Sequence, residues 1–199
     1  MHLLFFLVIS YIIGSIPTGF LLIKFFRNID IRTTGSNSTG ATNVLRSGNK
    51  ILALTTLIID VAKGYIIVLL SKEYCPRPFL ITSFVCIIAH IYPVWLKFRG
   101  GKGVSTMAGV FLALSPGLAT ISILTWAVVA KIFKISSLAS ISLAAMFLIL
   151  NLYMYMTESI DAAFLIFSIA VFALISFTHA SNIKRLIQHT EPKTIIKKK

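Results

Sequence analysis

The chain has 199 residues, of which 57% are hydrophobic and 13% are charged. This composition excludes an ordinary soluble domain and indicates a protein that lies in a membrane. The 19 Lys and Arg outnumber the 6 Asp and Glu and give a net charge of +13. In so apolar a chain, the excess is typical of basic cytosolic loops between spans. We therefore expect membrane lipid as a partner, and no nucleic acid.

Seven apolar segments predict membrane-spanning helices, because backbone groups in lipid must pair with one another. They lie near residues 3–26, 51–71, 79–96, 104–115, 117–133, 137–156 and 160–178. The first has no Lys or Arg before it and is longer than the core of a cleaved signal, so we interpret it as a span. We expect one membrane domain over residues 1–199, ending in a basic cytosolic tail at 190–199.

The number of spans is decided by charge. The region 104–133 could be one long helix, or two short helices broken at Pro116. Basic residues cluster at 24–50, 97–102, 131–134 and in the C-terminal tail, and the positive-inside rule places all of them in the cytosol. Two crossings are then needed between the middle clusters. We predict an all-α, seven-transmembrane-helix bundle with its N-terminus outside, its C-terminus cytosolic and its active site on the cytosolic face.

The first polar loop combines small residues, hydroxyls and glycines directly before a helical pattern. Its candidate phosphate ligands are Gly35, Ser36, Asn37, Ser38, Gly40, Thr42, Asn43 and Arg46. Gly and Asn tolerate positive φ, so successive N–H groups can point into one concavity, and an arginine adds a fork of donors. Ala41 stands where a nucleotide P-loop needs lysine, which excludes that motif. An ordinary Ser/Thr-rich loop that caps a helix explains the composition equally well.

Charged residues also occur within the second span, where Asp60 and Lys63 are one turn apart. Charges inside a membrane are expensive and are usually paired or functional. The i,i+3 spacing lets these two neutralise each other, so we prefer a structural ion pair to a catalytic dyad. In the first span, the run from Gly14 to Gly19 around Pro17 predicts a kinked, closely packed segment.

The second polar loop places Gly100, Gly101 and Gly103 around Lys102, after His90. Glycines let the backbone approach a ligand closely, and the lysine ammonium supplies a point charge. We interpret this loop as a second anion-binding element. A flexible basic linker at the membrane surface is the plainer alternative.

The third polar region follows the last span, where His179 and Asn182 share one helical face. Ser137, at the head of the sixth span, is a further candidate ligand, although such serines often bond only between helices. A polar helix end with surface charges would give the same pattern for His179 and Asn182. Cys75 and Cys86 have no metal-type spacing, and we expect neither a metal nor a cofactor.

These motifs together resemble the acyl-phosphate-dependent glycerol-3-phosphate acyltransferases of bacteria, which are integral enzymes of the inner (plasma) membrane. The matching runs, in chain order, are Gly14 to Gly19, Gly40 to Asn43 with Arg46, Asp60 to Gly64, His90 to Val104, and Asn182 to Arg185 with Glu191. Each run is weak alone, but their joint order along nearly the whole chain is specific.

The sequence departs from the family pattern at two places. The family usually has Gly-Asn where this chain has Asn37-Ser38, and we expect Asn37 to adopt the positive φ that glycine supplies. Serine is shorter than the usual asparagine at Ser38. The family also usually has glycine where His189 stands, a difference that bears on the local turn and not on the chemistry.

The resemblance implies seven helices and transfer of a fatty acyl group from acyl phosphate to glycerol 3-phosphate, giving lysophosphatidic acid and phosphate. We expect Ser36, Arg46, Lys102, His179 and Asn182 to be the catalytic residues of this reaction. The base is His179 or a phosphate of the substrate. A soluble enzyme that makes acyl phosphate is a further expected partner. An activated donor needs no acyl-enzyme, in agreement with the lack of a Ser-His-Asp order.

Two other classes of function compete with this interpretation. A small anion transporter could use basic loops and glycines, but its site should lie near the membrane midplane. A scaffold that binds anionic lipid through its basic tail would not need the Gly-Gly-Lys-Gly loop.

Overall fold

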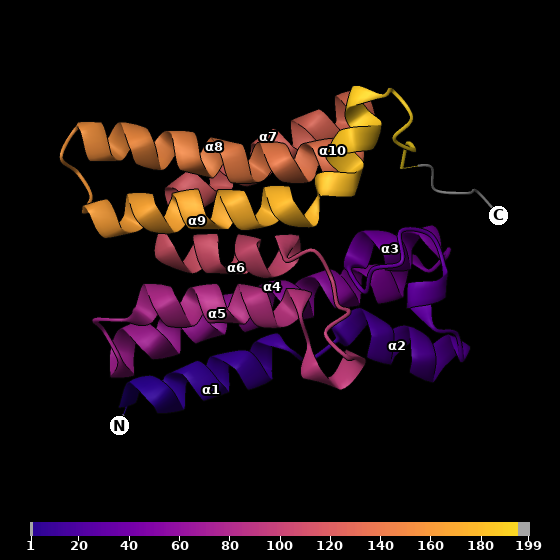
Figure 1. Ribbon diagram of the computed structural model, residues 1–199, viewed down its shortest axis with the longest axis horizontal. Coiled ribbons are helices and arrows are strands. Elements are labelled where there is room, and N and C mark those ends of the chain that lie inside the picture. The colour runs from indigo at the N-terminus through magenta and orange to yellow at the C-terminus, as the bar shows by residue number, and fades with distance from the viewer. Residues whose placement is uncertain (1, 195–199) are drawn as a thin grey trace. The chain divides into compact units, whose positions relative to one another are not determined.

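The computed structural model describes residues 2–194, and every regular element in that range is helical. In chain order these elements are α1 (His2–Gly14), α2 (Thr18–Arg27), η1 (Ile31–Thr33), α3 (Ala41–Arg46), α4 (Lys50–Tyr74), α5 (Phe79–Ile91), η2 (Val94–Leu96), α6 (Val104–Leu114), α7 (Pro116–Phe133), α8 (Ser136–Met156), α9 (Ala162–Thr178) and α10 (Ala180–Ile187) (Figure 1). The prediction of an all-helical membrane protein is confirmed for these residues. The last five residues of the predicted basic tail lie outside the described range.

Five segments are long and apolar enough to cross a membrane, and all five were predicted from the sequence. They are Leu3–Arg27, Lys50–Tyr74, Phe79–Leu96, Pro116–Phe133 and Ser136–Met156. A sixth passes only as the pair α9 and α10, which is bent by 68°, and α6 has 11 residues, too few for a comfortable crossing. The helices do break at Pro116, as predicted, but the count of seven spans and their orientation stay predictions.

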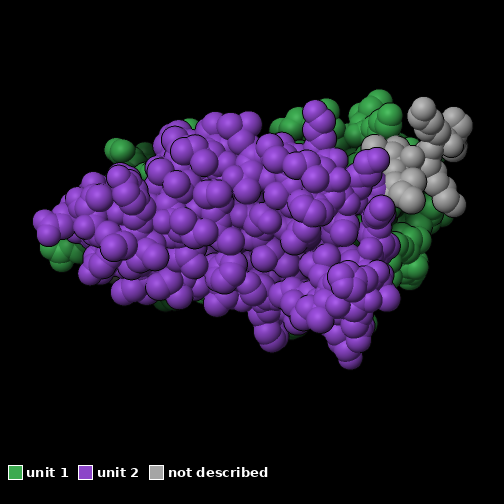
Figure 2. Space-filling view, turned by 90° about the horizontal axis from the view of Figure 1, so that it is seen from above, with its two compact units in different colours: residues 1–114, 196–199 green, residues 115–195 purple. Residues whose placement is uncertain are grey.

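The chain forms two compact units, coloured separately in Figure 2. Within the described range, the first contains residues 2–114 and the second contains residues 115–194. The predicted break at Pro116 is therefore also the boundary between two packing units. Each unit carries some of the predicted site residues.

Glycines bring the helices of the first unit close together. A Cβ at Gly64 of α4 would overlap the backbone oxygen of Thr106 in α6, and one at Gly109 would overlap the backbone of Val61. At Gly14, a Cβ would meet the backbone of Cys86 in α5. Lipid gives helices no hydrophobic reason to associate, so such close backbone packing is a main source of their attraction.

The first span is kinked, as its sequence predicts. α1 ends at Gly14 and α2 begins at Thr18, after Pro17. α2 then packs beside the first polar loop, because Gly19 leaves room for the backbone oxygen of Thr39. Under the loop lies a small apolar cluster of Ile23, Ile31, Val44, Leu52 and Ala53, which joins α2, η1, α3 and the start of α4. This cluster gives the loop a fixed base.

The second unit packs α7 on α8, α8 on α9, and α10 against both α8 and α9. Three of its buried serines bond to their own helices: the Oγ atoms of Ser122, Ser140 and Ser168 donate to backbone oxygens four residues earlier, at 2.6–2.9 Å. For Ser140 this is the ordinary helical role, and it satisfies a polar group inside lipid.

Candidate active site

Asn43 organises the first polar loop. Its side chain is 1% exposed, and its Oδ1 accepts a hydrogen bond from the N–H of Ser36 at 2.9 Å. Its Nδ2 lies 2.8–3.0 Å from the carbonyl oxygens of Ile31, Thr34 and Ser38. The amide therefore bonds to loop backbone. A direct contact between Asn43 and a phosphate stays a prediction.

The loop backbone takes the left-handed conformations that its sequence predicts. Gly35 has a φ of +59° and Asn37 has a φ of +55°, so asparagine does replace the usual glycine here. Gly35 has a second constraint, because a Cβ there would overlap Asn43 Oδ1. The hydroxyls of Ser36 and Ser38 are 3.1 Å apart, which gathers two predicted ligands at one point.

The cationic ligand of this loop is Arg46, in the last turn of α3. Its Cδ would lie 3.7 Å from a Cβ built on Gly35, so its stem runs beside the turn that carries Ser36. Thr42 lies in the first turn of the same helix, and both side chains are half-buried. Gly40 precedes the helix as its N-cap, and a Cβ there would meet nothing within 4 Å. There is open space beside this backbone.

An ion pair that sequence reasoning missed lies at η1, directly before the first polar loop. Arg32 binds both carboxylate oxygens of Asp30, with the shortest distance, 2.7 Å, from Nη2 to Oδ2. Its Nη1 also reaches the backbone oxygen of Leu96 at 3.4 Å. The hydrogen bonds from Arg32 hold the pKa of Asp30 below its usual value. Arg32 thus connects the first loop with the second.

The second loop packs tightly on the end of α5. The N–H of Gly100 donates to Ile91 O at 3.0 Å, and the N–H of Gly101 donates to His90 O at 3.1 Å. A Cβ at Gly100 would overlap His90 O, and one at Gly101 would overlap the His90 ring. Gly103 has a φ of +84°. These glycines are therefore required by packing, and they fix the backbone on both sides of the half-buried Lys102.

The two loops meet within the first unit. The N–H of Thr39 donates to Gly100 O at 3.3 Å, next to the Arg32 contact with Leu96. The structure thus brings the loop of Ser36 and Arg46 beside the loop of Lys102. The remaining predicted ligands, Ser137, His179 and Asn182, belong to the second unit.

Glu191 is the centre of the polar cluster in the second unit. Its side chain is 3% exposed, and its Oε1 accepts from Ser137 Oγ at 2.7 Å and from Asn182 Nδ2 at 2.6 Å. Its Oε2 accepts from Arg185 Nε at 2.7 Å. Sequence reasoning placed Glu191 only within a motif and assigned it no contacts. The structure gives Glu191 the role of joining two predicted ligands, Ser137 and Asn182. In the nearby turn, His189 has a φ of +56°, a conformation that favours glycine.

His179 is buried at the junction of α9 and α10, with 2% exposure. Its Nδ1 lies 2.8 Å from Ile175 O and 3.3 Å from Thr178 Oγ1. A carbonyl can only accept, so we assign the proton of the neutral ring to Nδ1, which leaves a lone pair on Nε2. A role for His179 as base is consistent with this tautomer.

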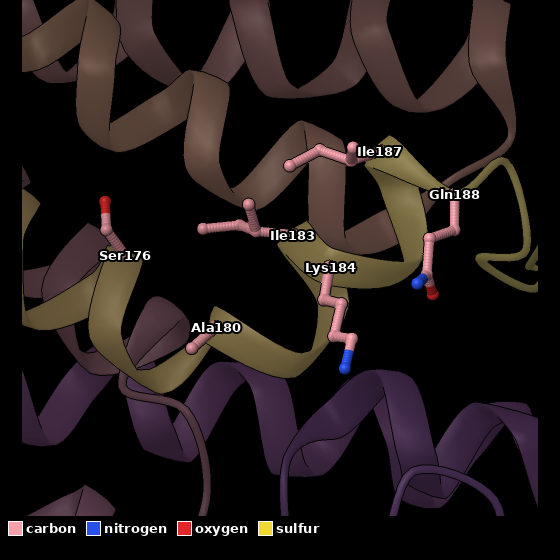
Figure 3. Close-up of a pocket in the computed structure, with 6 residues that line it drawn as sticks. All are labelled: Ser176, Ala180, Ile183, Lys184, Ile187 and Gln188. Atoms are coloured by element: carbon pink, nitrogen blue, oxygen red, sulfur yellow. The ribbon is translucent and has the colours of Figure 1, made fainter.

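A pocket of about 370 Å³ lies at the bend between α9 and α10 (Figure 3). It is lined by Ser176, Ala180, Ile183, Lys184, Ile187 and Gln188. The spacing along α10 puts Asn182 and Arg185 on the opposite side of that helix. The pocket is therefore separate from the Glu191 cluster. Within residues 2–194, no group of three His, Cys, Asp or Glu could hold a metal ion.

Comparison with known proteins identifies the class first: this helical membrane chain is an acyltransferase. Residues 4–189 match the family model described as glycerol-3-phosphate acyltransferase. The chain belongs to the glycerol-3-phosphate acyltransferase family, as its motifs predicted.

Relatives of the same family match over nearly their whole length. The glycerol-3-phosphate acyltransferase of Pelagibacter ubique is 42% identical over 94% of this chain and 95% of its own. That of Prochlorococcus marinus strain MIT 9215 is 46% identical, with 92% and 93% coverage. The crystal structure of PlsY (YgiH), an integral membrane glycerol 3-phosphate acyltransferase, in its glycerol 3-phosphate form is 32% identical with a TM-score of 0.87. It covers 96% of this chain and 94% of its own, and its lysophosphatidic acid form has a TM-score of 0.83.

A pH dependence follows from the contacts of Glu191. Burial alone would raise the pKa of Glu191, but hydrogen bonds from Ser137, Asn182 and Arg185 outweigh burial and lower it. A lowered folded pKa stabilises the fold above the usual value of 4.5 and loses this effect as pH falls through the folded pKa. The melting temperature of the native protein should therefore exceed that of Glu191→Gln more at pH 7 than at pH 4. An equal difference at both values would contradict the assigned contacts.

Proposed function

We propose that this protein transfers a fatty acyl group from acyl phosphate to the sn-1 hydroxyl of glycerol 3-phosphate. The hydroxyl oxygen forms a bond to the acyl carbonyl carbon, and the bond from that carbon to the phosphate oxygen breaks. The products are lysophosphatidic acid and inorganic phosphate. The observation that carries the proposal is the family match over residues 4–189, together with a similar structure determined in its glycerol 3-phosphate form.

The first unit supplies the phosphate ligands in this proposal. Ser36, Thr42 and Arg46 bind one phosphate, and Lys102 with the backbone of 100–103 binds the other. The contact between the two loops, Thr39 N–H to Gly100 O, supports a pair of anion sites side by side. Fixed donors of this kind stabilise the departing phosphate because they need no reorientation during the reaction.

A second group of residues positions the acceptor in this proposal. Asn182 and Ser137, joined through Glu191, orient the glycerol hydroxyl. Two groups could take its proton: Nε2 of His179, or a phosphate oxygen of the substrates. A His179→Ala variant distinguishes them, because loss of the base would remove the lower limb of the pH–rate profile, whereas a phosphate acceptor would keep it.

We also propose seven spans in the bacterial inner membrane, with the N-terminus outside and all the polar loops cytosolic. The basic clusters at 24–50, 97–102, 131–134 and in the tail support this arrangement, because two predicted spans separate each cluster from the next and so return the chain to the same side. Single cysteines at Asn37, Arg99 and Lys184, which are exposed positions, should react with an impermeant maleimide only from the cytosolic side. A cysteine at Glu73 should react from the opposite side. Labelling of the first three from different sides would overturn the proposal.

The donor is tested with purified enzyme offered acyl phosphate, acyl-CoA or acyl carrier protein in turn, with lysophosphatidic acid as the readout. We expect product from acyl phosphate alone. The soluble enzyme that makes acyl phosphate is then the partner expected to supply this substrate. Product from acyl-CoA and none from acyl phosphate would sink the donor assignment while leaving the acceptor assignment standing.

Two glycine substitutions should separate packing from ligand binding. A Cβ at Gly101 overlaps the His90 ring, so Gly101→Ala should lower both thermal stability and activity. A Cβ at Gly40 has open space and Gly40 has a φ of −75°, so Gly40→Ala should change the melting temperature much less than Gly101→Ala, by no more than the small loss of an N-cap glycine. If a substrate phosphate lies beside Gly40, the KM of Gly40→Ala for that substrate should still rise by about threefold or more, roughly 0.6 kcal/mol or more. Gly117→Ala, also in open space, is the control. An unchanged KM in Gly40→Ala would exclude a ligand beside Gly40.

A further inference from the structure

Three titratable side chains are buried together in the first unit, and the proposed chemistry uses none of them. Asp60, Lys63 and His90 are 1%, 5% and 7% exposed. Lys63 Nζ lies 2.9 Å from Asp60 Oδ1, as the sequence predicts for an ion pair, and His90 Nδ1 lies 3.7 Å from the same oxygen. With a neutral imidazole the cluster has no net charge. A buried ion pair is weak evidence for stability, because well-packed apolar residues often replace it without loss.

One side of the cluster reaches the second polar loop. The His90 ring lies where a Cβ of Gly101 would be, with Nε2, Cδ2 and Cε1 as its nearest atoms. The same residue's backbone oxygen accepts the Gly101 N–H at 3.1 Å. The ring therefore lies directly against Gly101, the residue before Lys102, and limits where its backbone can lie. Any tilt of His90 must move Gly101, because glycine has no side chain that could absorb the shift.

The other side of the cluster reaches the kink in the first span. Lys63 Nζ donates to Ile16 O at 3.2 Å, within the break between α1 and α2. Trp95 Nε1 donates to Ser15 Oγ at 2.8 Å, so the same break also touches η2. Lys63, which is bonded to Ile16 O, therefore fixes Asp60, and the Oδ1 of Asp60 faces His90 from a fixed position.

We propose that Asp60, Lys63 and His90 are positioning residues for the Lys102 loop. Lys63 fixes Asp60, Asp60 orients the His90 ring, and the ring sets the backbone at Gly101 and so the position of Lys102. This inference rests on the proposed function, because it gives Lys102 a phosphate to bind. It predicts that damage to the cluster raises the KM for a phosphate substrate as well as lowering stability.

Two substitutions of His90 separate its two contacts. His90→Phe keeps a ring against Gly101 but offers Asp60 no N–H. His90→Asn keeps an amide near the position of Nδ1 but removes the ring edge that faces Gly101. Both should raise the KM for at least one phosphate substrate by about fivefold, about 0.9 kcal/mol. A native KM in both would overturn the proposal.

The decisive comparison removes the charges one at a time and then together. Asp60→Asn leaves Lys63 buried without its partner and should lower the melting temperature as well as raise KM. Asp60→Asn with Lys63→Met removes both charges and should regain much of the lost melting temperature while its KM stays high. If KM returned to the native value together with stability, the cluster would be merely structural.

A matched control lies one turn before His90 on the same helix. Cys86 is fully buried, and its Sγ lies 3.9 Å from Lys63 O. Cys86→Ala should lower stability and keep the native KM. A raised KM in Cys86→Ala would show that any damage to this part of α5 has the same effect, and would overturn the assignment.

A coupling test connects the cluster with Lys102 itself. In a Lys102→Ala background, Asp60→Asn should raise KM no further, because the group being positioned is gone. A further rise by the same factor as in the native background would overturn the proposal. If the native enzyme gives no product with acyl phosphate, the proposed function fails first. If the native enzyme is active and the Asp60, Lys63 and His90 variants have its KM, the positioning role fails and the proposed function stands.

Discussion

Lys102→Ala and Arg46→Ala should each lower turnover by at least about tenfold, as expected for loss of a charge-assisted phosphate contact worth ~1.5 kcal/mol or more. Both residues are half-buried on fixed backbone: Lys102 follows Gly101, which packs on the His90 ring, and Arg46 lies in the last turn of α3. The variants should therefore fold normally and fail in catalysis. Steady-state rates with both substrates varied, together with melting curves, check this expectation.

Arg27→Ala is the control for a general loss of positive charge. Arg27 is exposed in the last turn of α2, in the same unit as Arg46 and Lys102. Arg27→Ala lowers the net charge by the same amount as Lys102→Ala or Arg46→Ala, and it should leave the rate near native. Near-native rates in both Lys102→Ala and Arg46→Ala would refute their roles as phosphate ligands.

Glu191→Ala should give the largest loss of stability. It leaves three donors, on Ser137, Asn182 and Arg185, without the carboxylate that they share. Hydrogen bonds to a charged group contribute about 1.5–3 kcal/mol each, but Arg185 is 40% exposed and can turn to water. We expect a total loss of about 2–4 kcal/mol and a melting temperature lower by roughly 5–15 °C.

Activity should fall with stability in Glu191→Ala, because Asn182 loses its fixed orientation. Glu191→Gln is the matched variant: it keeps an oxygen acceptor but loses the charge, so it should lie between native and alanine in both properties. Thr190→Ala is the control, because Thr190 is exposed and its Oγ1 makes only a 3.4 Å bond to Arg185 O. Native-like melting of Glu191→Ala would contradict the cluster.

Sequence patterns predicted the features that depend on local chemistry. Pro17 and Pro116 marked the two breaks, because proline removes a backbone donor and ends or kinks a helix. Asp60 and Lys63 were predicted as an ion pair from their spacing, and Asn37 was predicted at positive φ from its residue type. Each of these rules acts over a few residues, so the sequence alone contains what is needed.

Features that join distant segments could not be predicted in this way. Glu191 meets a serine 54 positions earlier, and His90 meets a glycine in a loop whose path depends on η2. Asn43 shows a different difficulty: its residue type suits a phosphate ligand and a loop organiser equally, and only the observed carbonyl partners reveal the second role. Residue type therefore located the site better than it assigned the roles.

The bond from Lys63 to Ile16 also bears on how the chain is inserted during synthesis. Ile16 is synthesised 47 residues before Lys63, so the carbonyl at the break of the first segment has no ammonium donor until α4 follows it. α4 then brings Asp60 and Lys63 in together, each opposed by about 2.5–3.5 kcal/mol if it entered alone. The pairing of Asp60 with Lys63 lowers the cost of inserting α4. Lys63 then supplies the hydrogen-bond donor that Ile16 O of the first segment had lacked. Pro17 sets the kink locally, but the carbonyl of Ile16 at that kink is expected to gain its donor only after the second helix has arrived.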